Sequence, residues 1–407
     1  MQLDVLIFGG GAAGLWLLDT LFWRGARVLL LESGSLGSGQ TIAAQGIIHG
    51  GLKYTLHGAL TPSAMQIREM PEHWRECHMG RRQPDLRGMR LRSPNCHLWR
   101  TDSFASRLAM LGARVGLNVI PQLLDVDERP AVLGRCPGPV ARIDEPVIAP
   151  DSLLETLFSK HKSRILKVDA AHVDWDFDAN RNVKTVRLAH PTWGRPLTLS
   201  PRNVVLAAGK GNLDLRRQLG LTEGAMQCRP LHMVLARGRL PELCGHCVDG
   251  AATRVTITSE RIADGRTVWQ IGGHIAEHGV SLDEQSLVRH ARSEIEATIP
   301  EIDLGGVEWS TYRVDRAEGV TAGGSRPETA QAVRECNVLT VWPTKLALAP
   351  VLAERVADVL GRFISAAAVD WAALEDWPRP EIARPPWETA RRWFTTAELE
   401  RLVRKAA

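Results

Sequence analysis

Three blocks of hydrophobic and polar positions open the chain, and together they predict a strand, a helix and a second strand. Residues 3–8 form a short apolar run rich in valine and isoleucine, and residues 12–24 carry apolar side chains at helical spacing. Residues 27–31 form a second apolar run, which ends at Glu32. Parallel pairing of the two runs requires a right-handed crossover, so the pattern predicts a βαβ unit.

Two later segments repeat the pattern of a buried strand. Residues 203–208 are one such run, and residues 338–342 are another. The second run precedes a helical pattern over about 345–365, and Pro343 suits the start of that helix better than its interior. These runs extend the α/β pattern towards the C-terminus.

The segments between these runs have antiparallel character. Residues 254–259 alternate in polarity, and the turn sequence Ala-Asp-Gly-Arg leads to a returning strand at 267–272, which predicts a hairpin. The order of patterns predicts an α/β fold in which a Rossmann-like nucleotide-binding domain, discontinuous in sequence, carries an inserted β-rich domain. We expect the first domain at residues 1–78, 145–222 and 310–376, the second at 79–144 and 223–309, and a C-terminal strap with a short helix at 377–407.

Composition narrows the class of protein. The chain has 407 residues, which is enough for two or three hydrophobic cores. Its net charge of +4 is too small to imply a nucleic-acid partner without a clustered basic stripe. A content of 44% hydrophobic and 24% charged residues excludes wholesale disorder. Seven cysteines, a sparse and odd number, argue against a secreted disulfide framework.

The most apolar stretch, residues 5–23, has the hydrophobicity of a signal peptide or a membrane span. No basic residue precedes it, and Asp19 and four glycines interrupt it. A buried strand, turn and helix explain it better, so we expect no transmembrane segment. We predict a cytoplasmic protein and leave open a peripheral contact with the inner face of a membrane.

The turn after the first strand reads Gly9-x-Gly11-x-x-Gly14, and Glu32 follows its last glycine by 18 residues. The first glycine permits the tight turn, the second lets a diphosphate approach the backbone, and the third allows close packing of helix on strand. Glu32 is placed to accept a hydrogen bond from an adenosine ribose. These residues predict a bound dinucleotide and leave NAD and FAD both open.

The sequence after Glu32 decides between the two cofactors. Residues 48–54, Ile-His-Gly-Gly-Leu-Lys-Tyr, are similar to the Ile-His-Gly-Gly-Leu-Arg-Tyr of glycerol-3-phosphate dehydrogenases, and residues 46–54 with Gly58 also resemble L-2-hydroxyglutarate oxidases. The chain thus resembles the FAD-dependent oxidoreductases of the D-amino-acid oxidase superfamily, which includes glycine oxidase and sarcosine oxidase. The resemblance implies FAD as the cofactor and a glutathione-reductase-like FAD-binding domain with an inserted substrate domain.

Further blocks carry the same resemblance. Residues 207–209, Ala-Ala-Gly, resemble the family's Ala-Thr-Gly at the end of a strand. Residues 309–313, Trp-Ser-Thr-Tyr-Arg, have the spacing of its Trp-x-Gly-Leu-Arg motif, whose arginine binds a substrate carboxylate, and Arg326 is a second candidate for that role. Residues 342–347 depart from the family, because Trp-Pro-Thr-Lys-Leu-Ala replaces its Gly-His-x-x-x-Gly. A helix start there would still direct amides at the flavin, and Lys345 would add positive charge.

The resemblance implies roles for residues at matching positions, and it implies that residues 46–54 run along the flavin ring. The implied cofactor-binding residues are Gly9, Gly11, Ala12, Ala13, Gly14, Glu32, Ser33, Thr41, Gln45, Gly46, Val168, Ala208, Gly209, Trp342, Lys345 and Leu346. The implied substrate-binding residues are His49, Lys53, Tyr54, Arg313 and His274, the last of which we expect on the second hairpin strand. The residues expected to take part in the chemistry are His49, Arg313 and Lys345.

Cys244-Gly-His-Cys247 has the spacing of a dithiol oxidoreductase motif, but its position argues against that role. Such motifs begin a helix after a strand, whereas this one precedes a turn. Zinc would need a second ligand pair, and none with suitable spacing lies nearby in the sequence. We interpret the two cysteines as structural and expect no metal. No Ser/His/Asp or paired-carboxylate motif stands out, so hydrolysis has little support.

The expected function is oxidation of a small anionic substrate, a 2-hydroxy acid or a phosphorylated polyol, by hydride transfer to flavin N5. A base must take the hydroxyl proton, and we interpret His49 as that base. Oxidation of an amino acid or amine, as in glycine oxidase, needs no base and is the alternative. A non-catalytic flavoprotein that binds a partner protein is the alternative of another class. The sequence does not indicate whether oxygen, a quinone or a protein accepts the electrons.

Overall fold

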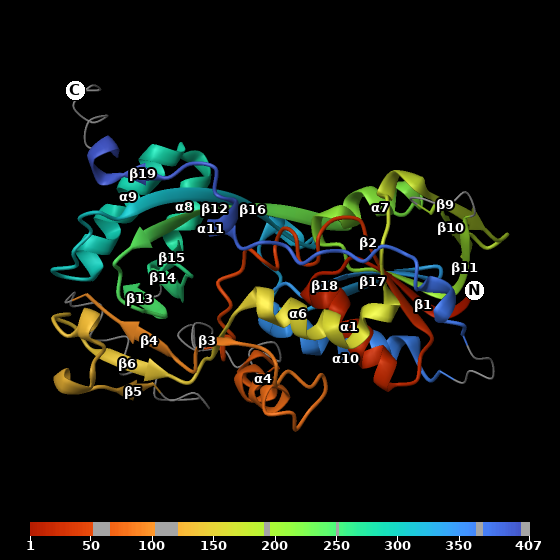
Figure 1. Ribbon diagram of the computed structural model, residues 1–407, viewed down its shortest axis with the longest axis horizontal. Helices are drawn as coiled ribbons and strands as arrows, with labels where there is room; N and C mark the ends of the chain where they lie inside the picture. Colours follow the sequence, from red (N-terminus) through yellow and green to blue (C-terminus); the bar gives the residue numbers. More distant parts are fainter. Residues whose placement is uncertain (52–65, 102–120, 191–195, 250–251, 364–368, 400–407) are drawn as a thin grey trace.

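The computed structural model describes residues 1–51, 66–101, 121–190, 196–249, 252–363 and 369–399. In these residues two large β-sheets occupy the two ends of an elongated molecule (Figure 1). Each sheet buries its own hydrophobic core. The core of the second sheet lies between that sheet and a helix.

The first sheet has eight strands in the described residues, with β17-β18-β11-β1-β2-β8 as its continuous order. Pairing is parallel from β18 to β8, so the connections must cross over one face of the sheet. The strands are β1 (Gln2–Phe8), β2 (Val28–Glu32), β8 (Ile165–Lys167), β9 (Val173–Phe177), β10 (Val183–Leu188), β11 (Leu197–Leu206), β17 (Gln331–Glu335) and β18 (Val338–Trp342).

Three helices cover one face of this sheet: α1 (Ala12–Trp23), α6 (Pro150–His161) and α10 (Ala349–Leu360). Their apolar side chains share a core with Val5 and Ile7 of β1. Leu6 and Phe8 point to the other face of the same sheet and belong to a separate core there. Side chains of a strand point alternately to its two faces, so a strand buried on both faces must be apolar throughout. This explains the continuous apolar run at the start of the chain.

The second sheet has nine strands in the described residues, in the order β19-β16-β12-β15-β14-β13-β4-β6-β5. Helix α9 (Glu284–Thr298) packs on one face, and its apolar residues share a core with Trp309. The strands are β4 (Cys96–Trp99), β5 (Gln122–Leu123), β6 (Val140–Ile143), β12 (Met226–Gly238), β13 (Gly245–Asp249), β14 (Ala252–Arg261), β15 (Thr267–Gly272), β16 (Glu308–Gly319) and β19 (Phe394–Thr395).

Smaller elements complete the described fold. Strands β3 (Leu91–Ser93) and β7 (Val147–Ile148) form a two-stranded sheet. The remaining α-helices are α4 (Met70–His78), α7 (Asn212–Gln218), α8 (His274–His278) and α11 (Pro386–Thr389).

Several sequence predictions are confirmed. The βαβ unit is present as β1, α1 and β2, and residues 338–342 form β18. The predicted hairpin is the antiparallel pair β14 and β15. The domain boundary drawn at residue 310 falls inside β16, which pairs with β12 along most of its length.

The helix predicted over about 345–365 is wrong in its start. A short 3-10 turn occupies Leu346–Leu348, α10 begins at Ala349, and Pro350 stands in its first turn. Pro343 therefore lies in the connection before the helix, because the chain first makes a sharp turn at Thr344. None of the described helices combines the length and apolar character that a membrane crossing needs.

Candidate active site

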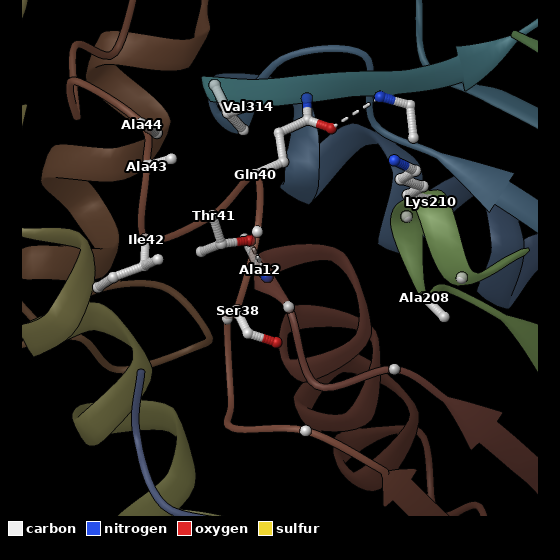
Figure 2. Close-up of a pocket in the computed structure, with 18 of the residues that line it drawn as sticks. Ala12, Ser38, Gln40, Thr41, Ile42, Ala43, Ala44, Ala208, Lys210 and Val314 are labelled. Atoms are coloured by element: carbon white, nitrogen blue, oxygen red, sulfur yellow. Dashed lines mark hydrogen bonds between the residues drawn. The ribbon is translucent and has the colours of Figure 1, made fainter. Parts of the chain in front are cut away.

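The larger of two adjoining cavities lies where β1, β2, β11 and β18 end. Its volume is about 660 Å³, and its wall includes Gly9, Glu32, Ala208 and Trp342, which close or directly follow these strands. Figure 2 shows Ala12, Thr41 and Ala208 from three segments around this space. Ligands of open parallel sheets bind at this edge.

Two of the motif glycines are required by close backbone approach. A Cβ on Gly9 would lie 2.5 Å from the Cα of Ala208, and the φ of Gly9 is +108°. A Cβ on Gly14 would lie 1.9 Å from the carbonyl oxygen of Gly9. Helix α1 and strand β11 can approach the first turn only because these positions lack side chains. Gly14 itself lies beneath the cavity wall rather than in it.

The Glu32 carboxylate is fixed by backbone amides at the cavity wall. Its Oε2 accepts a hydrogen bond from Gly10 N at 2.7 Å, and its Oε1 accepts one from Gly34 N at 2.6 Å. An ionised carboxylate has about four acceptor positions, so Glu32 can still accept from ribose hydroxyls. This geometry fits the predicted adenosine-binding role.

The first turn of α1 and Trp342 both line the same cavity. The N-cap residue Gly11 has no side chain to cap the first turn, although one amide of that turn, Ala12 N, donates to Thr41 Oγ1 at 3.1 Å. Amides at a helix N-terminus attract phosphate. The buried Nε1 of Trp342 has no hydrogen-bond partner among the described residues, although the residue lines the cavity. The donor set therefore fits a large ligand with phosphate groups and ring acceptors.

A smaller cavity of about 240 Å³ adjoins the larger one. The two cavities share lining residues at Gln40, Ala43, Ala44, Val314 and Leu346, so they lie directly against each other. The Gln40 side chain is fixed because its Oε1 accepts from Ala317 N at 3.1 Å (Figure 2). Such a volume is below the roughly 300–1,000 Å³ typical of drug-sized ligand sites, which indicates a small occupant.

His49 lines the smaller cavity and is held by a buried carboxylate. Its Nδ1 lies 3.2 Å from Glu145 Oε2, and Glu145 Oε1 accepts from Gly50 N at 2.7 Å. The Glu145 side chain is 2% exposed and the His49 side chain 35% exposed. The ring of His246 lies beside that of His49, with a centroid distance of 5.4 Å, and its Nδ1 contacts Thr256 Oγ1 at 2.9 Å.

Glu145 and His246 were not predicted from the sequence. Together with His49 they form a group whose ligand atoms lie within 4.8 Å of one another, a composition that could hold a divalent cation. The only sequence signal for His246 was its place inside the Cys-Gly-His-Cys segment. The expectation of no metal stays a prediction, because this group offers three potential ligands.

The side chains of β16 alternate between two environments. Val314 and Arg316 line the smaller cavity, whereas Arg313 is exposed and donates to the carbonyl oxygens of Val280 at 3.1 Å and Leu282 at 3.2 Å. Arg313 lines the larger cavity and not the smaller one. The structure therefore does not bring the predicted anion-binding arginine to His49, and Arg316, three positions further, occupies that wall instead.

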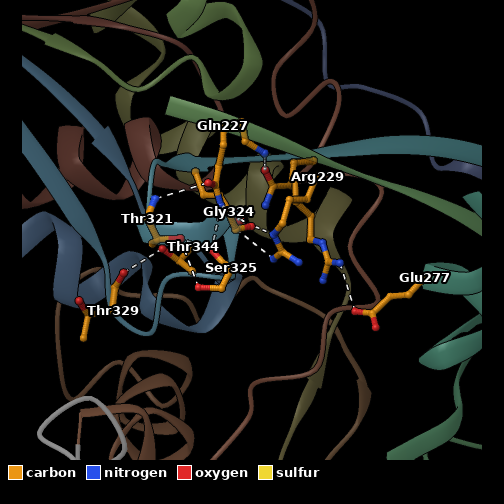
Figure 3. A network of polar contacts seen from close by, with 12 residues as sticks. Gln227, Arg229, Glu277, Thr321, Gly324, Ser325, Thr329 and Thr344 are labelled. Carbon is orange, nitrogen blue, oxygen red and sulfur yellow. Dashed lines mark hydrogen bonds and ion pairs between the residues drawn. The ribbon is translucent and has the colours of Figure 1, made fainter. Parts of the chain in front are cut away.

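Arg316 is a poorly neutralised cation. Its side chain is 15% exposed, its Nη2 contacts Glu277 Oε1 at 3.2 Å (Figure 3), and its buried Nε has no hydrogen-bond partner within the described segments. Burial, and then the positive charges of Arg229 and Arg326, lower the pKa of Arg316 below its ordinary value. Arg229 itself is paired with the buried Glu318. The wall would consequently bind an anion favourably.

Arg326, the second arginine proposed from the sequence, also lines this cavity. Its loop is held by Gln227, whose Nε2 donates to Ser325 O at 2.9 Å and Gly324 O at 3.3 Å (Figure 3). Arg316, Arg326 and Lys345 line this cavity, and Glu277 supplies a carboxylate among its described lining residues.

The segment before α10 makes a strained turn at the cavity. Thr344 has a φ of +65°, which is rare for a β-branched residue, and its Oγ1 donates to Thr329 O at 2.9 Å. This turn places Lys345 and Leu346 on the cavity wall, while Trp342 faces the larger cavity. Lys345 therefore lines the smaller cavity rather than the larger one, and its expected role beside the flavin stays a prediction.

The other predicted residues lie in several different places. Gly11, Ala12, Ala13, Ser33, Thr41 and Gly209 line the larger cavity, and Gln45 and Gly46 line the smaller one. Val168 is buried beside the larger cavity and donates its amide to Glu32 O at 2.9 Å. His274 is not on the hairpin strand: it is the exposed first residue of α8 and stacks on His278. Lys53 and Tyr54 lie outside the described residues.

Cys244 and Cys247 lie in different hydrophobic clusters on either side of β13. Cys247 lies on β13, Cys244 immediately precedes this strand, and both are free thiols. Burial raises the pKa of Cys244 and raises that of Cys247 to about 12. Thiols with raised pKa are poor nucleophiles, and the geometry supports a structural role for both.

Comparison with known proteins identifies the family to which the chain belongs. The family described as "FAD dependent oxidoreductase" matches residues 4–358. A probable FAD-dependent oxidoreductase of Pseudomonas aeruginosa is 38% identical over 398 residues, which span 96% of this chain and 98% of that protein. The chain belongs to this FAD-dependent oxidoreductase family. FAD is therefore the cofactor of the enzyme, and the donors and glycine contacts of the larger cavity fit it.

Solved structures of the family share the fold of this oxidoreductase. The crystal structure of the Pseudomonas protein has a TM-score of 0.81 at 36% identity, covering 96% of this chain and 98% of that chain. Glycine oxidase from Geobacillus kaustophilus has a TM-score of 0.60 at 20% identity over 94% of this chain and 99% of its own. L-α-Glycerophosphate oxidase from Mycoplasma pneumoniae has a TM-score of 0.62 at 14% identity over 91% and 97%.

Replacement of Glu32 by alanine should weaken FAD retention by about 10- to 100-fold, because a charge-assisted hydrogen bond to the ribose would be lost. Equilibrium dialysis with detection of released flavin measures this. Glu375→Ala removes an exposed carboxylate elsewhere and should retain FAD like the parent. Equal retention by Glu32→Ala and Glu375→Ala would contradict the assignment.

The variant with both Cys244→Ala and Cys247→Ala should keep the rate of flavin reduction within about threefold of the parent, because buried structural thiols carry no electrons. Its melting temperature should fall, since two buried side chains are shortened. Rapid-mixing absorbance and thermal unfolding measure the two quantities. A loss of turnover with FAD still bound would show instead that the cysteines carry electrons.

Proposed function

We propose that this oxidoreductase oxidises the hydroxyl-bearing carbon of a small anionic substrate, either a 2-hydroxy acid or a phosphorylated polyol. The single observation that carries the proposal is the smaller cavity, which has cationic side chains on one side and the His49–Glu145 pair on the other. The first group can bind a carboxylate or phosphate, and the second can accept a proton.

The separation of the two groups follows from the second sheet. Arg316 lies on β16, and His246, beside His49, lies on β13. Strands β12, β15 and β14 stand between them, so four spacings of about 4.8 Å separate the two backbones by roughly 19 Å. The long arginine side chain spans part of this distance. Arg316 and His49 nevertheless line the same cavity of about 240 Å³, so a substrate inside it can be bound by its anionic group while its hydroxyl faces His49.

In the proposed reaction Arg316 and Arg326 bind and orient the anionic group. The Nδ1 of His49 faces Glu145, which selects the tautomer whose Nε2 can accept the hydroxyl proton. Bound FAD supplies the acceptor for the hydride that leaves the same carbon, and a C=O group results. The negative charge of Glu145 stabilises the imidazolium that forms, while Leu231, Met233 and Val314 exclude water from the cavity.

Oxidation of an amino acid is the alternative that the same cavity would support. Arg316 and Arg326 would bind its carboxylate, and a neutral amine loses a hydride without a base. The buried Glu145 favours the hydroxy substrate. Its negative charge stabilises an imidazolium, and His49 becomes an imidazolium only if it takes a proton from a hydroxyl.

Anaerobic titration of the yellow holoenzyme tests the proposal. We expect the flavin absorbance to bleach with 2-hydroxy acids or with glycerol 3-phosphate, and to persist with neutral alcohols of the same length. Bleaching by amino acids alone would select the alternative. A flavin that no anionic compound of either class reduces would contradict both.

Arg316→Lys should lower the second-order rate constant of flavin reduction by about 10- to 100-fold, because lysine cannot form the planar two-point contact of a guanidinium with an anion. Arg313→Lys is the matched control three residues away on the same strand, and it should change that constant little. Rapid-mixing absorbance over a series of substrate concentrations gives both values. A larger loss in Arg313→Lys would return the anion site to Arg313.

His49→Ala should slow flavin reduction by a hydroxy substrate by about 10²- to 10⁴-fold, the usual contribution of a positioned base. On the transition-state scale this is roughly 3–5.5 kcal/mol. Rapid mixing across pH measures the loss, with an amine substrate expected to show little loss once it is deprotonated.

Glu145→Gln separates positioning from packing, because glutamine keeps the size of the side chain and removes its charge. We expect a slower reduction whose pH profile moves to lower pH, because without the carboxylate the imidazolium of His49 is less stable and its base form persists to lower pH. An unchanged pH profile would make Glu145 structural. Loss of activity on chelation with recovery on Zn²⁺ would make the group a metal site.

A further inference from the structure

The described C-terminal segment, residues 369–399, contains the described part of the predicted strap, and the whole segment is called the strap below. It runs along the outside of the molecule from the first sheet through α11 to β19 (Figure 1). It is anchored at both ends. Trp377 is buried in a core of the first sheet, and Pro378 O accepts from Lys167 N at 2.9 Å. Phe394 pairs with Trp309 of β16 and is buried in the core of the second sheet. The strap therefore connects the two parts of the fold.

Between its anchors the strap forms part of the wall of the FAD cavity. Arg384, Pro386 and Thr389 line that cavity. Trp387, next to Pro386, is buried against Leu235 and Val268 of the second sheet. This wall was not predicted from the sequence, because the strap carries none of the family motifs.

A parallel bridge fixes the position of Arg384. Ile382 pairs with Leu36, Leu36 N donates to Glu381 O at 2.7 Å, and Ala383 N donates to Leu36 O at 3.0 Å. The Leu36 side chain lies directly over the glycine turn, where a Cβ on Gly10 would be 2.3 Å from its Cδ2. Arg384 follows two residues after the bridge and therefore begins beside the phosphate-binding turn.

Arg384 differs from the other cationic residues of the cavity wall, Lys210 and Arg313, in its polar contacts. Lys210 is paired with Asp315 at 2.5 Å, and Arg313 donates to two carbonyl oxygens. Arg384 makes no hydrogen bond or ion pair with any residue in the part of the chain that the structure describes. A diphosphate carries two negative charges, and the amides at the start of α1 carry only partial positive charge.

We propose that Arg384 of the strap binds the diphosphate of FAD and that the strap is the outer wall of the cofactor site. The inference concerns cofactor binding and is independent of which substrate the enzyme oxidises. The guanidinium can contact two phosphate oxygens at once, which a lysine in the same place cannot do.

The rate at which FAD leaves the diluted holoenzyme, followed by the rise in flavin fluorescence, tests the proposal. Arg384→Ala should release FAD about 10- to 100-fold faster than the parent, and Arg384→Lys should be intermediate. Arg391→Ala removes an exposed arginine of the same strap that does not line the cavity, and it should behave like the parent. Release from the parent should also accelerate with salt more steeply than release from Arg384→Ala, because salt screens the ion pair.

A second measurement identifies which part of FAD is bound. In protein freed of flavin, Arg384→Ala should weaken the binding of ADP by a similar factor and leave the binding of adenosine unchanged, as calorimetry would measure. Equal loss for adenosine and ADP would overturn the assignment to the diphosphate. Equal release rates and salt dependences for parent and Arg384→Ala would overturn the proposal as a whole.

Discussion

Close contact between backbones at the edge of the first sheet is the constraint on which the rest of the structure depends. The turn at Gly9 meets the end of β11 at Ala208, and α1 starts against the same turn because residue 14 has no side chain. These contacts fix where β1, α1 and β11 end, and so they define the space in which a diphosphate can approach amides. The Glu32 carboxylate and the Leu36 side chain are then positioned around an already rigid turn.

The parts of the fold that the sequence predicted are those determined locally. The first βαβ unit, the β14–β15 hairpin and β18 each follow from apolar periodicity and turn chemistry within a few residues. Helix α10 begins later than predicted because Thr344 adopts a positive φ. Threonine disfavours this conformation, so nothing in the sequence indicated the turn. The strap wall needed knowledge of a bridge between Leu36 and Ile382, residues far apart in the chain.

In the candidate site, too, the residues that local motifs indicate were predicted, and those that depend on distant contacts were not. His49 and Arg326 were named from motifs, and both line the smaller cavity. Arg313 was named from its motif too, but the face on which a strand residue lies depends on the exact register, and an odd shift in position reverses it. Arg316 could have been considered from the alternation along β16 once Val314 was placed at the cavity. Glu145 is 96 residues from His49, and no local pattern joins them.

The strained conformation of Thr344 links folding stability to the arrangement of the cavity. A left-handed β-branched residue costs on the order of 1–3 kcal/mol, which neighbouring contacts must offset. Here the hydroxyl of Thr344 holds Thr329 O, and the loop that ends at Thr329 carries Arg326 and is fastened at its other end by Gln227. The strain is thus stored in the same segment that orients a cavity-lining cation. Selection for a more thermostable enzyme would tend to relax this turn first, and a variant improved in that way would hold its arginine loop less rigidly, so robustness and substrate discrimination would trade against each other at one residue.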